Sequence, residues 1–246
     1  MYPRVRYAPR VWSAADFELF SPRFQADPEW NGRRLELRRR LQEFGELLRP
    51  RAATAAGMDL ERRESLHHPH ASNGNRVARQ RTMLFRGKQE RKALQRFLGP
   101  ELAKDLDSAH RSAHLQFGVE ERGAFWGLRW EKDAWFDLNV LVKRAEEGAG
   151  QAALAQACAA APGFVFEVDG GGARPLEKIG QRDWRDLAGF LQPGKHAVEV
   201  VHRAPREAVL QAGAAFDGTV IEAILRLVPL FRLGCWTADS PSGARW

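Results

Sequence analysis

Residues 67–76, HHPHASNGNR, gather side chains that could do chemistry. Three histidines surround one proline, and Asn73 and Asn75 flank Gly74 just before Arg76. Asn-Gly is a strong turn former, and asparagine tolerates the left-handed backbone that a turn needs. The stretch is therefore either a turn leading into a strand or a polar rim that selects a ligand.

A train of basic residues follows this loop. Between residues 76 and 96 the chain has eight Lys or Arg against one acid, Glu90. Guanidinium groups match phosphate oxygens and bind them two at a time. We therefore expect an anionic ligand, either nucleic acid or a phosphate-bearing metabolite, with a solvated surface as the alternative. The predicted ligand-binding residues are Arg76, Arg79, Arg81, Arg86, His68, His70, Asn73 and Asn75.

A second candidate site is a divalent metal centre. His110 and His114 are four residues apart, so on a continuous helix they would share a face and could bind one ion, with Asp137 as a third ligand. The residues between the histidines are Arg-Ser-Ala, so the glutamate of a HExxH motif is absent. Ordinary hydrogen-bonded histidines are the alternative, and they imply no cofactor. A metal site would favour an enzyme acting on a small substrate, and exposed tryptophans would favour a protein-interaction module.

Charge and cysteine content narrow the class of protein. The net charge is +7, but residues 1–100 hold 21 Lys and Arg against 11 Asp and Glu, which again suggests an anionic partner. Cys158 and Cys235 lie far apart, with neither zinc nor redox spacing. There is no N-terminal apolar export segment, and no apolar run approaches the roughly 20 residues that span a bilayer. We expect a cytoplasmic protein with no membrane partner.

Two helices are predicted before the histidine loop. The stretch 12–20 has Ser13 and Asp16 at capping-box spacing. Residues 31–50 repeat apolar residues at helical spacing and should end at their final proline. Residues 51–75 have no periodicity and are predicted to be a long connection.

Alternating apolar residues predict neighbouring strands over 114–120 and 124–130, after an extended stretch at 76–86. Residues 135–145 fit either a helix or a strand, and their β-branched valines favour the strand. Further elements are predicted as helices over 87–100, 101–113, 151–161, 181–191 and 217–228, and as strands over 163–168 and 196–202.

The last of these helices has Thr219 and Glu222 at capping-box spacing and should end at Pro229. Together the elements predict one α+β domain over 1–246, with a largely antiparallel sheet and helices mainly on one face. A seam is possible near 146–151. The tail 237–246 is predicted to be flexible, unless its tryptophans dock.

Three stretches resemble the YktB-like group of uncharacterised bacterial proteins: WSAADFELF, the arginine-rich helix ending in LLRP, and HLQFGVEERGAFWGLRW. The resemblance covers roughly residues 12–145. It implies a compact α+β fold with an antiparallel sheet, and it supplies no established activity and no catalytic residue. The chain departs from that group in the loop 67–76 and in a helical insert over 88–113.

Overall fold

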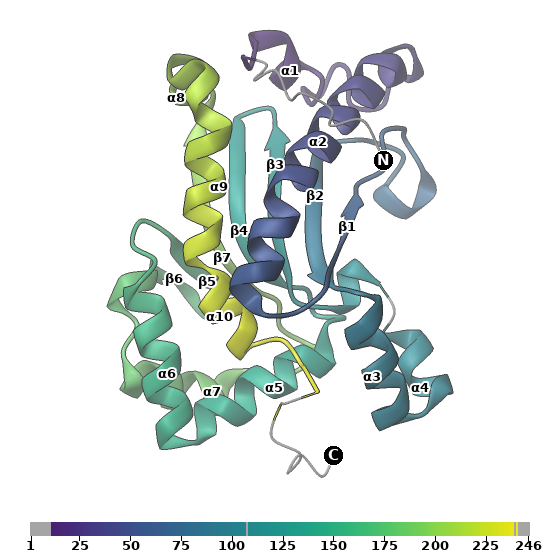
Figure 1. Ribbon diagram of the computed structural model, residues 1–246. Coiled ribbons are helices and arrows are strands. Elements are labelled where there is room, and N and C mark those ends of the chain that lie inside the picture. Colours follow the sequence, from purple (N-terminus) through teal and green to yellow (C-terminus); the bar gives the residue numbers. More distant parts are fainter. Residues whose placement is uncertain (1–10, 107, 239, 241–246) are drawn as a thin grey trace.

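The described part of the chain forms a seven-stranded antiparallel sheet (Figure 1). The computed structural model describes residues 11–106, 108–238 and 240. The strands lie in the order β1-β2-β3-β4-β7-β5-β6. Their bounds are β1 Leu60–Glu64, β2 Arg79–Arg86, β3 His114–Glu120, β4 Gly123–Trp130, β5 Val165–Val168, β6 Gly172–Pro175 and β7 Val198–Pro205.

Helices gather on one face of this sheet and beyond one end of it. Figure 1 shows α2 and α9 side by side in front of the strands, with α5, α6 and α7 below them. This arrangement confirms the predicted α+β class with helices mainly on one face. The helices are α1 Ala14–Glu18, α2 Asn31–Ala56, α3 Lys88–Leu98, α4 Pro100–Asp105, α5 Trp135–Glu146, α6 Gly148–Ala159, α7 Gln181–Phe190, α8 Arg206–Ala212, α9 Phe216–Arg226 and α10 Val228–Leu233.

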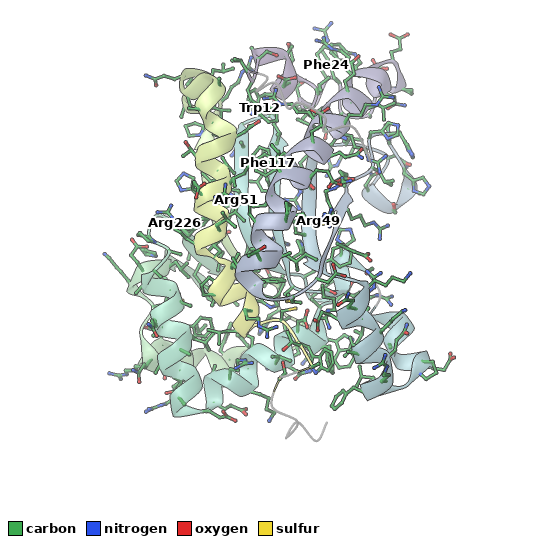
Figure 2. All side chains as sticks on the ribbon, viewed as in Figure 1. Trp12, Phe24, Arg49, Arg51, Phe117 and Arg226 are labelled. Atoms are coloured by element: carbon green, nitrogen blue, oxygen red, sulfur yellow. The ribbon has the colours of Figure 1, made fainter. Side chains whose placement is uncertain are left out.

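The main hydrophobic core lies between the sheet and these helices. Alternate residues of β3 and β4 point into it, as their predicted period of two requires. The ring of Phe117 lies 4.2 Å from that of Phe44 on α2 and 5.8 Å from that of Trp12. Figure 2 labels Phe117 between α2 and α9, where both helices cover it.

The opposite face of the sheet carries polar side chains and a small apolar cluster. Met83 and Phe85 of β2 are buried there with Ala109, apart from the main core. Ala109 begins a 3-10 turn, η3 (Ala109–Arg111), which leads into β3. The sequence predicted these inward-facing residues of β2 but not that they face away from the main core.

The predicted capping box of the first helix is confirmed. The backbone N–H of Ser13 donates to Oδ2 of Asp16 at 2.8 Å, and the Ser13 hydroxyl lies 2.9 Å from the same oxygen. Strands β2, β3 and β4 also occur where the sequence predicted them, as do helices α3, α6 and α7.

The predicted end of the second helix at Pro50 is wrong. Helix α2 continues to Ala56 and ends at Gly57, whose φ of 61° is the left-handed conformation that glycine adopts readily. Pro50 removes one backbone donor, but Leu48, Ala52 and Ala56 continue a buried stripe at helical spacing. The predicted connection 51–75 therefore contains the last turns of α2 and the whole of β1.

The predicted strand over 135–145 is also wrong, because these residues form α5. A helix allows them to bury two faces at once. Leu138, Leu141 and Ala145 join the main core, while Phe136 and Val140 join a second cluster with residues of α3. Packing on both faces outweighs the weak strand preference of the valines.

The ends of α9 also differ from the prediction. The helix begins at Phe216, and the Thr219 hydroxyl donates to the carbonyl of Ala215 at 3.1 Å, so Thr219 is inside the helix and is not its cap. Pro229 lies at the start of α10, where a missing N–H costs nothing. The predicted helix 101–113 reduces to α4 and η3, with residue 107 outside the described residues.

Residues on both sides of the predicted seam share one core, since Ala145 and Leu154 belong to the same buried cluster. Trp236 is buried, as docking by tryptophan predicted, whereas Trp246 and most of the tail lie outside the described residues.

Both cysteines are buried free thiols. Within the described part of the chain, every helix is too short or too polar to cross a bilayer.

Candidate anion-binding site

The connection between β1 and β2 brings the three loop histidines together. The ring centroids of His67 and His68 are 5.1 Å apart, and those of His68 and His70 are 6.0 Å apart. Both pairs meet edge to face. The predicted grouping of His68 and His70 is therefore present, with His67 as a third member.

The Asn-Gly-Asn stretch closes a turn, as the simpler interpretation predicted. The backbone N–H of His70 donates to Oδ1 of Asn73 at 2.9 Å, and the N–H of Asn75 donates to the carbonyl of His70 at the same distance. Gly74 and Asn75 have φ values of 68° and 56°, both left-handed. The amide oxygen of Asn73 is thus used within the turn, where it orients His70.

The loop is fastened to the body of the protein just before β2. Val77 is buried, and its backbone N–H donates to the carbonyl of Gln25 at 2.7 Å. In Figure 1 the loop lies beside the N-terminal half of α2, at the upper right. This places the histidines next to arginines that precede them by about thirty residues.

Arg34 of α2 is a buried cation held by neutral groups. Its side chain is fully buried, and its guanidinium donates to the carbonyls of Phe24 and Asp27 and to Oδ1 of Asn31. Figure 2 labels Phe24 beside the start of α2. Burial lowers the pKa of Arg34, and the negative charge of Asp27 opposes this only in part. Neutral acceptors satisfy N–H groups, but they leave the positive charge uncancelled.

Arg38 lies four residues further along α2, on the same side of the helix as Arg34. The Nε atoms of both arginines are buried and have no hydrogen-bond partner. Among the residues that the structure describes, no carboxylate forms an ion pair with either guanidinium. Two positive charges therefore lie on one side of the helix without an ion-paired carboxylate, and Asp27 acts on Arg34 only at longer range.

The pKa of His67 is affected by these charges. Burial lowers the pKa of its imidazole, and the neighbouring His68, Arg38 and Arg34 lower it further. Its Nδ1 atom is buried and has no hydrogen-bond partner in the described structure. We call Arg34, Arg38, His67 and His68 the histidine–arginine cluster.

The arginines that the sequence predicted as ligand contacts do not converge. Arg76 and Arg79 are exposed, and Arg79 lies over the ring of Phe125 at 5.7 Å. Arg81 and Arg86 are both on β2 but project from opposite faces of the sheet, because five residues separate them. Of the predicted set, His68 belongs to the histidine–arginine cluster and the ring of His70 lies 6.0 Å from that of His68, whereas Arg81 and Arg86 lie on β2.

Both of these strand arginines are already neutralised. Arg86 pairs with Asp137, and neither side chain is exposed. Arg81 donates to Glu131 at 2.9 Å and to Gln116 at 2.7 Å. A buried guanidinium whose charge a carboxylate already balances offers little to a further anion.

Arg81 belongs to a closed ring of polar side chains on the second face of the sheet. Gln116 donates to Glu199 at 2.7 Å, Arg129 lies 3.0 Å from Glu199 and 2.8 Å from Glu131, and Arg81 completes the ring. Burial would raise the pKa of Glu131, but Arg129 and Arg81 lower it to about 2. The two arginines of this ring balance its two glutamates. Its side chains come from β2, β3, β4 (with Glu131 directly after it) and β7, and so link these four strands.

The three predicted metal ligands are not brought together. Asp137 accepts from Arg86 and from the backbone N–H groups of Ala113 at 2.7 Å and Trp236 at 3.0 Å, so its oxygens are occupied. His110 and His114 have ring centroids 6.5 Å apart, and β3 begins at His114, so no continuous helix joins them. The described residues contain no group of three His, Cys, Asp or Glu side chains that could hold a metal ion.

His114 is instead a neutral buried histidine. Its Nδ1 lies 3.0 Å from the carbonyl of Ser112 and must donate to it, which leaves Nε2 as the unprotonated nitrogen. Burial and the charge of Arg81 lower its pKa to about 3. This is the hydrogen-bonded histidine that the sequence offered as the alternative to a metal ligand.

Sequence reasoning missed Arg34 and Arg38 as site residues because α2 meets the loop only in the tertiary structure. A signal was present, since both arginines flank the apolar position Leu37 and so border the buried stripe of the helix. A charged side chain at the border of such a stripe lies close to the element that packs against the helix.

Comparison with models of known protein families gives no match for this chain. Comparison with curated proteins gives no relative either. The resemblance to the YktB-like group therefore stays a prediction, and the geometry of the histidine–arginine cluster is what bears on function.

Proposed function

We propose that this protein binds a small anionic ligand at the histidine–arginine cluster. The observation that carries the proposal is a set of buried nitrogen atoms without hydrogen-bond partners, Nε of Arg34, Nε of Arg38 and Nδ1 of His67, on two arginines that have no ion-paired carboxylate among the described residues. Buried positive charge is costly unless an anion compensates it. A phosphate or sulfate group supplies both the charge and the hydrogen-bond acceptors that these atoms lack.

The small number of arginines in the histidine–arginine cluster favours one anionic group over a nucleic-acid backbone. Binding along a backbone needs several phosphate contacts spread over the surface. Arg81 and Arg86 cannot supply them, because their charges are balanced inside the protein. Arg34 and Arg38, by contrast, have no ion-paired carboxylate among the described residues.

As part of the same proposal, we place the protein in the cytoplasm. Cys158 and Cys235 are both free thiols. Unpaired cysteines are the usual state in a reducing compartment. Phosphate-bearing metabolites are abundant ligands there.

The test is a titration with sodium sulfate and with inorganic phosphate at low ionic strength, followed by calorimetry. We expect saturable binding that Arg38→Gln weakens at least tenfold, since a hydrogen bond to a charged group contributes roughly 1.5–3 kcal/mol. The matched control is Arg39→Gln, which removes an exposed arginine from the next position of the same helix. It should leave the dissociation constant unchanged.

Two results would overturn the proposal. One is the absence of saturable binding by either anion. The other is binding that Arg38→Gln and Arg39→Gln weaken equally, which would indicate a general surface attraction. Parallel titrations with short DNA and RNA test the backbone alternative: tight binding that falls steeply with salt and ignores Arg38→Gln would replace the proposed site with the exposed arginines.

A further inference from the structure

Strand β1 ends the sheet on one side, and β2 is its only strand neighbour. In Figure 1 it lies at the right-hand margin of the sheet. We infer that β1 pairs with β1 of a second copy of this chain, antiparallel and across a two-fold axis at Arg63, so that two sheets join into one. This interaction surface does not depend on the proposed anion site.

The direction of the backbone groups along β1 follows from one hydrogen bond to β2 at each end. The N–H of Ser65 donates to the carbonyl of Arg81 at 2.9 Å, and the carbonyl of Asp59 accepts from the N–H of Gly87 at 2.7 Å. In an antiparallel pair, the N–H and C=O of one residue point to one side of the strand, and those of the next residue point to the other side. Odd-numbered residues of β1 therefore bond to β2, and even-numbered residues direct their backbone groups away from the sheet.

The outward backbone groups in the middle of β1 belong to Arg62 and Glu64. The structure shows no hydrogen bond to these groups from any residue that it describes. Such unpaired groups at a sheet edge are a template for pairing with another chain. The opposite edge is a poorer template, because β6 is four residues long and ends at Pro175, which has no N–H to donate.

Antiparallel geometry and charge together select one register. Residues with outward groups must lie opposite one another, so a two-fold pair centred on β1 can place Arg62 opposite Arg62, Glu64 opposite Glu64, or Arg62 opposite Glu64. The first two arrangements put like charges directly opposite, which is destabilising. The third puts opposite charges together twice, once on each side of the axis. It also places Arg63 opposite its own copy on the axis.

The side chains of Arg62 and Glu64 already lie together on the face of β1 that α2 covers. They form an ion pair, and Arg62 also lies 3.0 Å from Glu46 of α2, where Gly45 leaves room for it. In the dimer each Arg62 would lie beside the partner's Glu64, so that four charges alternate across the axis. Arg63 is exposed and projects from the other face, where its two copies would repel each other. Removing this charge should therefore strengthen the dimer.

The first test combines sedimentation velocity with amide hydrogen exchange followed by NMR. A five-residue edge is a small interface, so we expect a reversible dimer that forms between about 1 and about 500 µM. Where the dimer predominates, exchange of the Arg62 and Glu64 amides should slow roughly tenfold, because these N–H groups bond to the partner. The amides of Glu61 and Arg63 bond to β2 in both states and should not change.

The second test uses substitutions in β1. Arg63→Ser should lower the dissociation constant of the dimer by about threefold, since it removes the repulsion on the axis. The matched control is Arg185→Ser, which removes an exposed arginine from α7 and should leave the dissociation constant unchanged. Glu64→Pro removes one outward N–H at an edge position where proline is tolerated, and it should weaken the dimer at least tenfold. Glu64→Gln keeps that N–H and should weaken the dimer less.

Three results would overturn the inference. They are a monomer at every concentration, a dimer in which the Arg62 and Glu64 amides exchange as they do in the monomer, and a dimer that Glu64→Pro leaves intact. The exchange measurement and Arg63→Ser do not involve the proline, so they decide the case even where Glu64→Pro does not fold. None of these measurements involves an anion, so their outcome is separate from that of the proposed function.

Discussion

The guanidinium of Arg86 and the carboxylate of Asp137 form an ion pair in which neither side chain is exposed to solvent. The pair joins β2 to α5, and Asp137 also accepts from the backbone N–H of Trp236 in the C-terminal segment. One carboxylate thus holds together three parts of the chain that are far apart in sequence.

We predict that Asp137→Asn lowers the free energy of unfolding by about 3–5 kcal/mol, because Arg86 would remain buried without its counter-charge. Urea denaturation followed by tryptophan fluorescence measures the change. The comparison is Lys143→Gln, which breaks the exposed pair with Glu146 and should cost less than about 1 kcal/mol. Equal effects of the two substitutions would contradict the structural importance of the buried pair.

Gly118 on β3 lies beneath the ring of Phe125 on β4. A Cβ at Gly118 would collide with that ring and would come within 2.8 Å of the carbonyl oxygen of Gln80. Gly118→Ala should therefore lower stability by about 1–3 kcal/mol, measured as the shift in the urea midpoint. Gly32→Ala in α2, where nothing lies within 4 Å, should leave stability unchanged or raise it by up to about 1 kcal/mol. A neutral Gly118→Ala would show that Phe125 does not cover this position.

His114 should make the protein less stable as the pH falls. Its pKa is about 3 in the folded protein, whereas an exposed histidine titrates near 6.5. Below pH 6.5 His114 therefore binds a proton in the unfolded chain but not in the folded protein. The contribution of neutral His114 to the free energy of unfolding is lost progressively between pH 6.5 and 3. From pH 7.5 to 5.0 we expect a loss of about 2 kcal/mol from this residue.

The measurement compares urea unfolding at these two pH values in the unmodified protein and in His114→Gln. The variant should be less sensitive to pH by that amount, whatever its absolute stability. Glu131 does not interfere, since its pKa of about 2 makes its contribution disappear only as the pH falls from about 4.5 towards 2. Identical pH sensitivity in both proteins would rule out a buried neutral His114.

Trp236 should control the stability of α3 and α4. Its ring lies 5.7 Å from Phe97 and 6.3 Å from Phe136, in the cluster that also contains Leu94 and Leu106. Trp236→Ala should lower stability by about 3–5 kcal/mol and accelerate amide hydrogen exchange over residues 88–106. Exchange that speeds up uniformly over the chain, with no excess in this segment, would contradict a local role.

Local patterns in the sequence were sufficient where one interaction dominates. The alternation in β3 and β4 reports directly which side chains face the core, and the Ser13–Asp16 box depends on atoms three residues apart. The same reasoning was wrong at Pro50 and over residues 135–145. At Pro50, burial of Ala52 and Ala56 outweighed a local cost of about 3 kcal/mol for proline inside a helix. Over residues 135–145, burial of both faces of α5 outweighed a strand preference of about 1 kcal/mol.

The sequence by itself determined the α+β class, most of the elements, the turn at Asn73–Asn75 and the basic character of the first hundred residues. Only the tertiary structure decided which basic residues stay unbalanced. Alternation along β2 sends Arg81 and Arg86 to opposite faces, where Glu131 and Asp137 neutralise them. Arg34 and Arg38 have no ion-paired carboxylate among the described residues. Ion pairing depends on which acids come within a few ångströms of a guanidinium group, and spacing along the chain does not specify that distance.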